Sequence, residues 1–312
     1  MKSNRKTKTI VLIVLGIIFT ILPLFINKTS LSVRDRDNSS NYKGNDCDNL
    51  KISAVSGKIH INNNWTATKT AGICTGNGTY ADPYIIEDLV IDGGGSGNCI
   101  WIENSSVYFK IEDCTIYNSG IDWDDTCIKL QLVSNGVLFN NTANFTSTAI
   151  YLYNSDNITL TENTAKNCRW GIYLYYSDNN IISGNTVNDT WDGINLYYSD
   201  NNTISGNTAN FNDNNGIELG YSNNNIISGN TVNYNLAGMH LYYSNNNTIS
   251  GNTLNGNSNC WFEDDCEGNV FDNNSCRNRK IIPPVILGYN ILILLGILSV
   301  VAILISKKLK KS

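Results

Sequence analysis

Residues 149–259 contain five copies of one sequence pattern, spaced by 22 or 23 residues. Aligned on their first residue, the copies begin AIYLYNSDN, GIYLYYSDN, GINLYYSDN, GIELGYSNN and GMHLYYSNN. Self-similarity at a short fixed period is typical of stacked repeat proteins, in which each repeat packs only against its neighbours. The chain is therefore expected to fold as a solenoid and not around a single globular core.

Within one repeat the apolar residues lie at spacing two, as in Ile172 and Leu174, and are followed by Ile182 and Val187 after polar turn residues. This spacing predicts three short strands per coil and no helix. Equivalent residues recur in each coil, so neighbouring strands should be parallel and in register, about 4.8 Å apart. A leucine-rich repeat has a similar period but a Leu-dominated consensus and a helical return segment, which is absent here.

Asparagines recur at one position of every coil and form a predicted column along the stack. A stacked amide can donate to the next coil and accept from the previous one, so a structural ladder is expected. A second asparagine column follows three residues later and is expected to be inaccessible as well. The first column consists of Asn141, Asn163, Asn185, Asn207, Asn230, Asn252 and Asn274, and the second of Asn144, Asn188, Asn210, Asn233 and Asn255.

The Ile-x-Leu pair followed by NNxISGNT resembles the right-handed parallel β-helix repeats of the pectate-lyase-like superfamily. In particular it resembles the group named after the periplasmic copper-binding protein NosD, also called the carbohydrate-binding and sugar-hydrolase domain. The resemblance covers about residues 84–276 and implies an all-β, right-handed parallel β-helix of about nine coils. It implies no single activity, because the superfamily holds lyases, hydrolases, epimerases and adhesins.

The segments outside the repeats predict an exported, membrane-anchored protein. Basic residues precede an apolar run at residues 10–26, and a charge-free run of 22 residues at 285–306 is followed by KKLKKS. Such a run spans a bilayer as a helix, and its flanking lysines favour a cytoplasmic tail. We expect residues 27–280 to be extracytoplasmic. The predicted organisation is a signal peptide or signal anchor (1–26), a spacer (27–46), an N-terminal cap (47–83), the β-helix (84–276), a linker (277–284), a transmembrane helix (285–306) and a basic tail (307–312).

The expected outer part of the chain is strongly acidic. Eight of the 22 Lys and Arg residues lie in the terminal segments, which leaves 14 against all 27 acidic residues, a net charge of about −13 by this count. This charge argues against nucleic acid as a partner. The partners we expect are the membrane and either a glycan or a cell-surface protein. Twelve N-x-S/T sequons also make glycosylation feasible.

Nine cysteines in an exported chain predict disulfides with one thiol left over. Cys47 and Cys74 lie in the expected N-terminal cap, and Cys260, Cys266 and Cys276 lie in the last, irregular coil. Bridges at these positions would hold the two ends of the stack. The sequence leaves their pairing open.

Alternation along the first strand of each coil sends Ile172 and Leu174 inward and Tyr173 and Tyr175 outward. Repeated through the coils, this places tyrosines on one face, and amphipathic rings of this kind suit an extended glycan. Aromatic residues also stack well on a parallel sheet with no ligand, so a purely structural spacer remains an alternative. The expected carbohydrate-binding residues are Tyr151, Tyr153, Tyr173, Tyr175, Tyr197 and Tyr242.

Glu218 and His240 occupy equivalent outward positions of adjacent coils and are candidates for an acid and base pair. Enzymes that this fold resembles carry their catalytic acids on the same face. No GHG or RIK motif of the polygalacturonases is present, and the acids of the GIDWDD insertion begin about four coils away, about 20 Å at the strand spacing. The carboxylates of a glycosidase need about 5–10 Å between them. Binding is therefore favoured over catalysis, with a polysaccharide lyase or hydrolase as the alternative.

No metal site is expected, and no cofactor. There is no CxxC motif, and His60 and His240 are the only histidines, with Met239 as the sole thioether neighbour. The turn acids offer oxygen ligands for Ca²⁺, although such turns more often bond their own backbone, which is the interpretation we favour. These turn residues are Asp156, Asp178 and Asp200, continued by Asn223 and Asn245.

Overall fold

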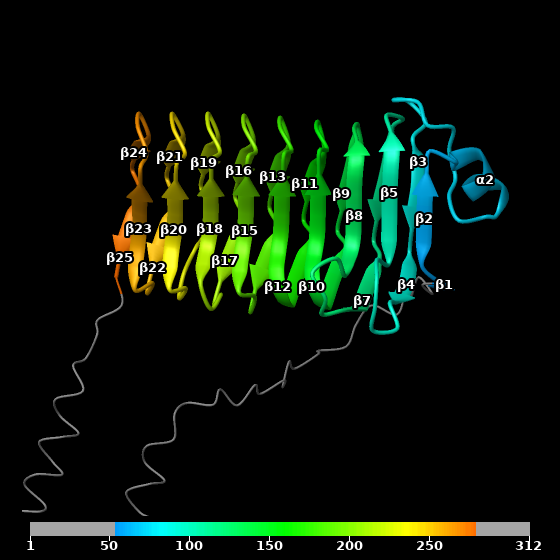
Figure 1. The fold of residues 1–312 in the computed structure, drawn as a ribbon, viewed down its shortest axis with the longest axis horizontal. Helices are drawn as coiled ribbons and strands as arrows, with labels where there is room; N and C mark the ends of the chain where they lie inside the picture. The colour runs from blue at the N-terminus through cyan, green and yellow to red at the C-terminus, as the bar shows by residue number, and fades with distance from the viewer. Residues whose placement is uncertain (1–53, 279–312) are drawn as a thin grey trace, which may run out of the picture. The chain divides into compact units, whose positions relative to one another are not determined.

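The computed structural model describes residues 54–278, which fall within one compact unit, residues 51–312; the other unit, residues 1–50, lies outside the described residues. The described residues form an all-β parallel solenoid of about nine coils, as predicted. Figure 1 shows the strands side by side along the stack, from β1 and β2 at one end to β23, β24 and β25 at the other.

The first strands of the coils, which carry the Ile-x-Leu motif in the regular repeats, form one wall of the stack, called here the first face. They pair only in parallel. They are β2 (Ile59–Asn62), β5 (Ile100–Ser105), β8 (Thr126–Val133), β10 (Thr142–Tyr153), β12 (Thr164–Tyr175), β15 (Asp192–Tyr197), β18 (Asn215–Gly220), β20 (Ala237–Tyr242) and β23 (Asn259–Asp264).

The second strands form a separate nine-stranded sheet. They are β3 (Tyr84–Glu87), β6 (Phe109–Glu112), β9 (Gly136–Phe139), β11 (Thr159–Thr161), β13 (Ile181–Ser183), β16 (Thr203–Ser205), β19 (Ile226–Ser228), β21 (Thr248–Ser250) and β24 (Val270–Asp272). The third strands are β1 (Ala54–Ser56), β4 (Leu89–Asp92), β7 (Thr115–Gly120), β14 (Thr186–Asn188), β17 (Thr208–Asn210), β22 (Thr253–Asn255) and β25 (Ser275–Arg277). The long strands β10 and β12 join the third strand of one coil to the first strand of the next.

The core is a set of columns of like apolar residues. Ile172, Ile194 and Ile217 lie opposite one another in adjacent strands, and each is at most 1% exposed. The predicted spacing of two is confirmed within the strand, because Tyr173 faces outward between the buried Ile172 and Leu174. Burying this apolar stripe in every coil is the main force that holds the stack together.

A glycine is the first residue of four successive sequence repeats, at a corner where adjacent coils approach closely. A Cβ atom on Gly193 would lie 2.3 Å from the backbone oxygen of Gly216. A Cβ atom on Gly216 would in turn lie 2.2 Å from Val232 Cγ1. Only glycine fits at this corner, because real Cβ contacts are longer than these distances.

The first asparagine column forms a continuous hydrogen-bonded ladder at a bend. Asn185 Nδ2 donates to Asn207 Oδ1 over 3.0 Å, and Asn207 Nδ2 donates to Asn230 Oδ1 over 3.0 Å. The same Oδ1 of Asn207 accepts the backbone N–H of Asn185 over 2.9 Å, and its Nδ2 also donates to Ile182 O over 2.8 Å. Each buried amide is thus satisfied by the coils on both sides.

The second asparagine column is half-buried and faces outward, so the expectation that it is inaccessible is wrong. Its side chains bond only the next backbone, as when Asn188 Oδ1 accepts the N–H of Asn210 over 2.9 Å. The inaccessible ladder predicted for this column is formed instead by other, buried columns of serine and asparagine. They are Ser155, Ser177, Ser199, Ser222 and Ser244; Asn180, Asn202, Asn225 and Asn247; and Asn212, Asn235 and Asn257.

The N-terminal end of the stack is closed by α2 (Trp65–Thr70). Trp65 is buried and stacks on Tyr84, with ring centroids 4.9 Å apart, and its ring lies tilted against that of Phe109, with centroids 5.4 Å apart. Part of the segment expected to be a cap, residues 47–83, is itself a coil strand, because β2 pairs with β5 in register. The remainder of that segment before residue 54 lies outside the described residues.

The C-terminal coil is held by a disulfide between Cys260 and Cys276, whose Cα atoms are 5.8 Å apart. Cys266 is a free thiol, because it takes a position of the serine column, where its sulfur accepts the backbone N–H of Ser244. Cys74 is also free and buried, and Cys47 lies outside the described residues. The disulfide expected at the C-terminal end is present, whereas Cys74 and Cys266 are each free thiols in the structure.

Within residues 54–278, no helix has the length and apolar character needed to span a bilayer. The two segments predicted to enter the membrane, residues 10–26 and 285–306, lie outside the described residues.

Candidate binding face

The outward columns of the first face bring the predicted tyrosines into contact. Tyr151 stacks on Tyr173 with ring centroids 5.3 Å apart. The ring centroid of Tyr175 lies 5.7 Å from the ring centroids of both Tyr153 and Tyr197. All five rings are half-buried by their neighbours. The parallel register of identical strands is sufficient to produce this arrangement.

Tyr242 continues the column across the gap at Gly220. Its ring centroid lies 6.3 Å from that of Tyr197, although Gly220 separates them in the stack. A Cβ atom on Gly220 would lie 2.4 Å from the Tyr242 hydroxyl oxygen. The glycine therefore gives the ring room to lean over its position, a packing detail that strand alternation cannot predict.

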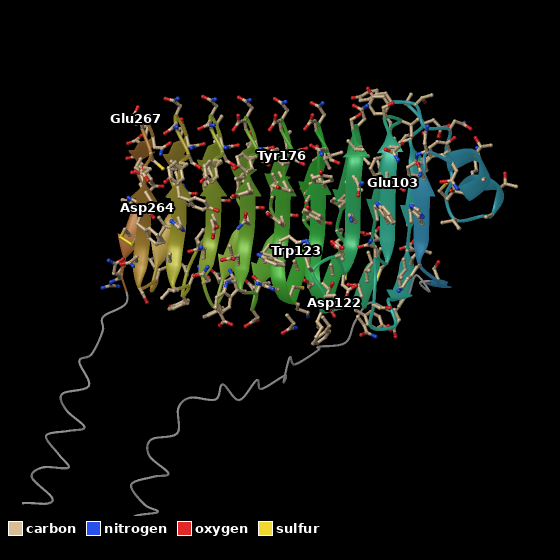
Figure 2. All side chains as sticks on the ribbon, viewed as in Figure 1. Glu103, Asp122, Trp123, Tyr176, Asp264 and Glu267 are labelled. Atoms are coloured by element: carbon tan, nitrogen blue, oxygen red, sulfur yellow. A yellow bond between two sulfur atoms is a disulfide. The ribbon has the colours of Figure 1, made fainter. Side chains whose placement is uncertain are left out.

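A further row of tyrosines lies at the bend that follows the first strand, called here the bend tyrosines: Tyr176, Tyr198, Tyr221 and Tyr243. Successive rings stack with centroids 4.8–5.0 Å apart. Tyr176 is 45% exposed and Tyr243 47%, more than the half-buried rings of the strands. Figure 2 shows Tyr176 near the ends of the strands.

Each bend tyrosine has a φ angle between 47° and 50°, in the left-handed region. This conformation is uncommon for bulky residues and favours Gly or Asn, as at the equivalent Asn154 with φ 46°. Local strain of this kind costs on the order of 1 kcal/mol per residue and clusters at functional sites. The bend therefore holds aromatic residues where backbone preference alone would select asparagine.

Three phenols of the face are held in the neutral form over the physiological range. Burial raises the pKa of Tyr151 and of Tyr173 well above the ordinary value. Burial also raises the pKa of Tyr242, and the nearby carboxylate of Glu218 adds to the shift. A neutral hydroxyl can both donate and accept a hydrogen bond, which suits the hydroxyl groups of a sugar.

The face ends in a hollow of about 600 Å³ at the C-terminal coils, called here the acidic hollow. Three successive coils build it, because Glu218, His240 and Phe262 lie in register on β18, β20 and β23. Its lining is Asn214, Asn215, Glu218, His240, Tyr242, Tyr243, Phe262, Asp264 and Asp265.

Glu218 and His240, the candidate acid and base pair, share this hollow but bond different partners. Glu218 accepts a hydrogen bond from the side chain of Asn215. His240 Nε2 lies 3.0 Å from Asp264 Oδ2, and its ring packs 4.1 Å from that of Phe262. Sequence reasoning missed Asp264, although its register with Tyr242 could have been read from the last coil.

A buried carboxylate lies behind the hollow. Asp192 is 6% exposed, and its Oδ1 accepts from the backbone N–H of Asn215 over 3.1 Å and from Asn214 Nδ2 over 2.8 Å. Burial raises the pKa of Asp192 to about 6, and the negative charge of Glu218 contributes. The site thus concentrates negative charge at one end of the face.

The opposite end of the face has a different character. Glu103 pairs with His60, whose Nε2 lies 2.8 Å from its Oε1, and the His60 ring stacks on Trp101 at 4.2 Å. Lys129 Nζ lies 5.2 Å from the centroid of the Trp101 ring. Figure 2 shows Glu103 and Asp264 at the two ends of the stack.

The acids of the insertion are not part of the hollow. Asp125 is buried, and its carboxylate accepts the backbone N–H groups of Gly97 and Asp122, so it holds the loop together. Asp122 lies at the edge of the strands away from Tyr176 (Figure 2). Asp125 therefore serves the loop, and none of the three acids lines the hollow with Glu218.

The turn acids bond the backbone of the following coil, and not their own backbone as predicted. Asp156 Oδ1 accepts the N–H of Asp178 over 2.7 Å, and Asp178 Oδ1 accepts the N–H of Asp200 over 2.7 Å. Asn223 and Asn245 continue the same pattern. The column is therefore a structural ladder at a second bend.

These features define a class: a parallel β-solenoid with an exposed aromatic face. The chain belongs to the family described as periplasmic copper-binding protein (NosD), whose model matches residues 111–283, more than half of the sequence. Among curated proteins, no sequence matches the chain.

Several solved structures share part of the fold. The periplasmic alginate epimerase AlgG, as a double mutant, is 16% identical, with 70% of this chain and 69% of that chain covered and a TM-score of 0.49. DFA-IIIase from Arthrobacter chlorophenolicus A6 is 12% identical, with 64% and 60% covered and a TM-score of 0.49. The A-module of the mannuronan C-5 epimerase AlgE6 from Azotobacter vinelandii is 16% identical, with 62% and 70% covered and a TM-score of 0.49.

The described donors do not fit the copper ion in the family's name. Within residues 54–278, no group of three or more His, Cys, Asp or Glu side chains is placed to hold a metal ion. His60 and His240 lie on β2 and β20, far apart in the stack, and Met239 is buried in the core. Burial raises the pKa of the Cys114 thiol to about 11 and that of Cys168 to about 12, which disfavours the thiolate that a metal needs.

Proposed function

We propose that the chain is a surface-anchored, extracytoplasmic protein that binds an extended glycan through its tyrosine face. This name covers the outward tyrosines of the first face together with the bend tyrosines. The observation that carries the proposal is the row of bend tyrosines, which all have a strained backbone and of which Tyr176, Tyr198 and Tyr243 have exposed rings. Asparagine would relieve the strain at these positions, so the stack itself has no need of tyrosine there. Flat rings with hydroxyl groups at regular spacing suit the apolar faces and hydroxyl groups of successive sugars.

The family description and the sequences of the two termini support this proposed location. The family is described as periplasmic, which agrees with an extracytoplasmic position for residues 27–280. We propose that residues 285–306 anchor the chain in the membrane with the basic tail 307–312 in the cytoplasm, and that the coils wind in the right-handed sense common to parallel crossovers.

Binding can be tested with a glycan array on the purified full chain. The informative variant replaces the four bend tyrosines by asparagine, and we expect it to fold normally and to lose glycan binding. The matched control is Tyr234→Asn, because Tyr234 is 57% exposed and also left-handed, with φ 61°, but lies at a different bend and stacks on Phe211. Equal binding by the native chain and the bend variant would contradict the proposal.

A second candidate function is cleavage of the bound polysaccharide. It is favoured by the acidic hollow, where His240 lies 3.0 Å from Asp264 and shares the space with Glu218. An acid and a base on opposite sides of a sugar are the minimum that a hydrolase or lyase needs. Product release that disappears in Glu218→Gln and in His240→Ala, with binding retained, would support catalysis.

A further inference from the structure

The acidic hollow differs from the rest of the tyrosine face in its charge. Its lining carries three carboxylates, Glu218, Asp264 and Asp265, and among the described residues that line it none is Lys or Arg. Glu218 takes its hydrogen bond from an amide, and Asp264 takes one from His240. The buried Asp192 adds a further carboxyl group behind Glu218.

Two cations lie near the face, and neither lines the hollow. Arg169 on β12 slightly lowers the pKa of Asp192, against the larger effect of burial, and its guanidinium packs 4.3 Å from the Trp170 ring. Lys129 lies on β8, four coils before β18 in the order of the sheet. At the parallel strand spacing this is about 19 Å, more than twice the Debye length of about 8 Å at physiological ionic strength. An anionic sugar such as a uronate would therefore be repelled at this end of the face.

The hollow also presents aromatic rings to the same space. Tyr242, Tyr243 and Phe262 line it, and the His240 ring lies 5.1 Å from that of Tyr242. Carboxylates combined with ring faces are the pattern that recognises an organic cation, through charge-assisted hydrogen bonds and cation–π contacts.

A buried acceptor without a hydrogen-bond partner lies one coil before the hollow. Asn195 lies next to Glu218 in the same outward column and is 7% exposed. Within the described part of the chain, its Oδ1 atom has no hydrogen-bond partner. Asn195 does not itself line the hollow, so a ligand's donor would reach this oxygen only after the side chain turns toward the hollow.

We propose that the acidic hollow binds the ammonium group of an amino sugar, so that the glycan held by the tyrosine face is a polysaccharide with free amines. This inference rests on the proposed glycan-binding function and names its ligand class. The rings of Tyr242 and Phe262 hold the sugar, while Glu218 and Asp264 receive its charged amine.

The test compares two oligosaccharides that differ only in acetylation. Glucosamine hexamer and N-acetylglucosamine hexamer are titrated into the purified full chain by calorimetry, at a mildly acidic pH at which the sugar amines are protonated. One charge-assisted hydrogen bond contributes about 1.5–3 kcal/mol, so we expect the free-amine hexamer to bind at least about tenfold more tightly.

Two variants locate the effect. Glu218→Gln and Asp264→Asn keep the shape of the side chains and should remove the preference for the free amine, while the N-acetylated hexamer binds as before. The control is Glu103→Gln, which alters a carboxylate on the same face at the other end of the stack and should leave the preference unchanged.

The outcomes separate the inference from the proposed function. Equal binding of the two hexamers, or tighter binding of the acetylated one, with loss of binding in the bend-tyrosine variant, would refute the amino-sugar site and leave glycan binding intact. Binding of neither hexamer, together with an empty glycan array, would refute both. A lysine-rich peptide that binds as tightly as the free-amine hexamer, and equally well in the bend-tyrosine variant, would also overturn the inference.

Discussion

Replacing Asn207 by alanine interrupts the asparagine ladder in the middle of the stack. In the native structure, Asn207 Oδ1 accepts from the backbone N–H and the Nδ2 of Asn185, over 2.9 and 3.0 Å. Its Nδ2 donates to Ile182 O and to Asn230 Oδ1, over 2.8 and 3.0 Å. Alanine removes all four of these hydrogen bonds in a region with no exposure to water.

The cost follows from which groups keep another partner. Asn185 Nδ2 still donates to Leu160 O over 2.9 Å, and Asn230 Oδ1 still accepts the backbone N–H of Asn207. The backbone N–H of Asn185 loses its side-chain acceptor and Ile182 O loses one donor. A buried unsatisfied group costs about 1–3 kcal/mol and a lost hydrogen bond about 0.5–1.5 kcal/mol. We expect the free energy of unfolding to fall by about 2–5 kcal/mol, a large part of the 5–15 kcal/mol typical of a domain.

The matched control is Asn188→Ala in the outward column. Asn188 is half-buried, and its Oδ1 accepts a backbone hydrogen bond from the N–H of Asn210 over 2.9 Å. Water can replace that acceptor, so its loss should cost about 1 kcal/mol or less.

Urea unfolding of the full chain, followed by far-ultraviolet circular dichroism, gives the overall change. Because stacked repeats can open locally, amide hydrogen exchange over residues 182–210 shows where protection is lost. If the two variants lower stability equally, or if exchange near Asn185 is unchanged in Asn207→Ala, the view that the buried ladder stabilises the stack is wrong.

Three further predictions concern single sites. Asp192 has a folded pKa of about 6, above its unfolded value of about 3.9, so its charge destabilises the fold increasingly as pH rises from about 4 to 6 and fully above that range. Asp192→Asn should therefore raise the free energy of unfolding by about 2–3 kcal/mol at pH 7 and leave it unchanged at pH 4. Urea unfolding at both pH values measures this difference. Iodoacetamide should label the half-buried Cys266 before Cys114 or Cys168, whose buried thiols have raised pKa values, and peptide mass mapping after timed quenching would show the order. Gly216→Ala should cost several kcal/mol, because its Cβ would lie 2.2 Å from Val232 Cγ1, and a melting temperature equal to that of the native chain would contradict the close-packed corner.

The fold could be predicted from the sequence because equivalent positions of successive repeats are the residues that pair in adjacent strands. Ile172, Ile194 and Ile217 recur at one position of the pattern, and the structure places them opposite one another. Parallel stacking of equivalent residues is the arrangement in which every coil buries the same stripe, so few alternatives compete.

The candidate site was less predictable, because it depends on departures from the repeat. Tyr242 reaches Tyr197 only because Gly220 leaves space, and a column read from spacing shows a gap there. His240 turns to Asp264, which belongs to the irregular last coil, and not to the in-register Glu218. The pairing of Cys260 with Cys276 depends on where Cys266 falls in the serine column, which no local pattern specifies.

The identical edges of the coils also affect how such a protein can change. Each regular coil offers the same amides and backbone groups to the coil before it and the coil after it. Duplication or loss of one whole 22- or 23-residue unit therefore leaves every new junction chemically equivalent to an old one. Evolution can thus lengthen or shorten the face by whole coils while the packing of the core stays the same. The two irregular terminal coils set the limits of the repeated part.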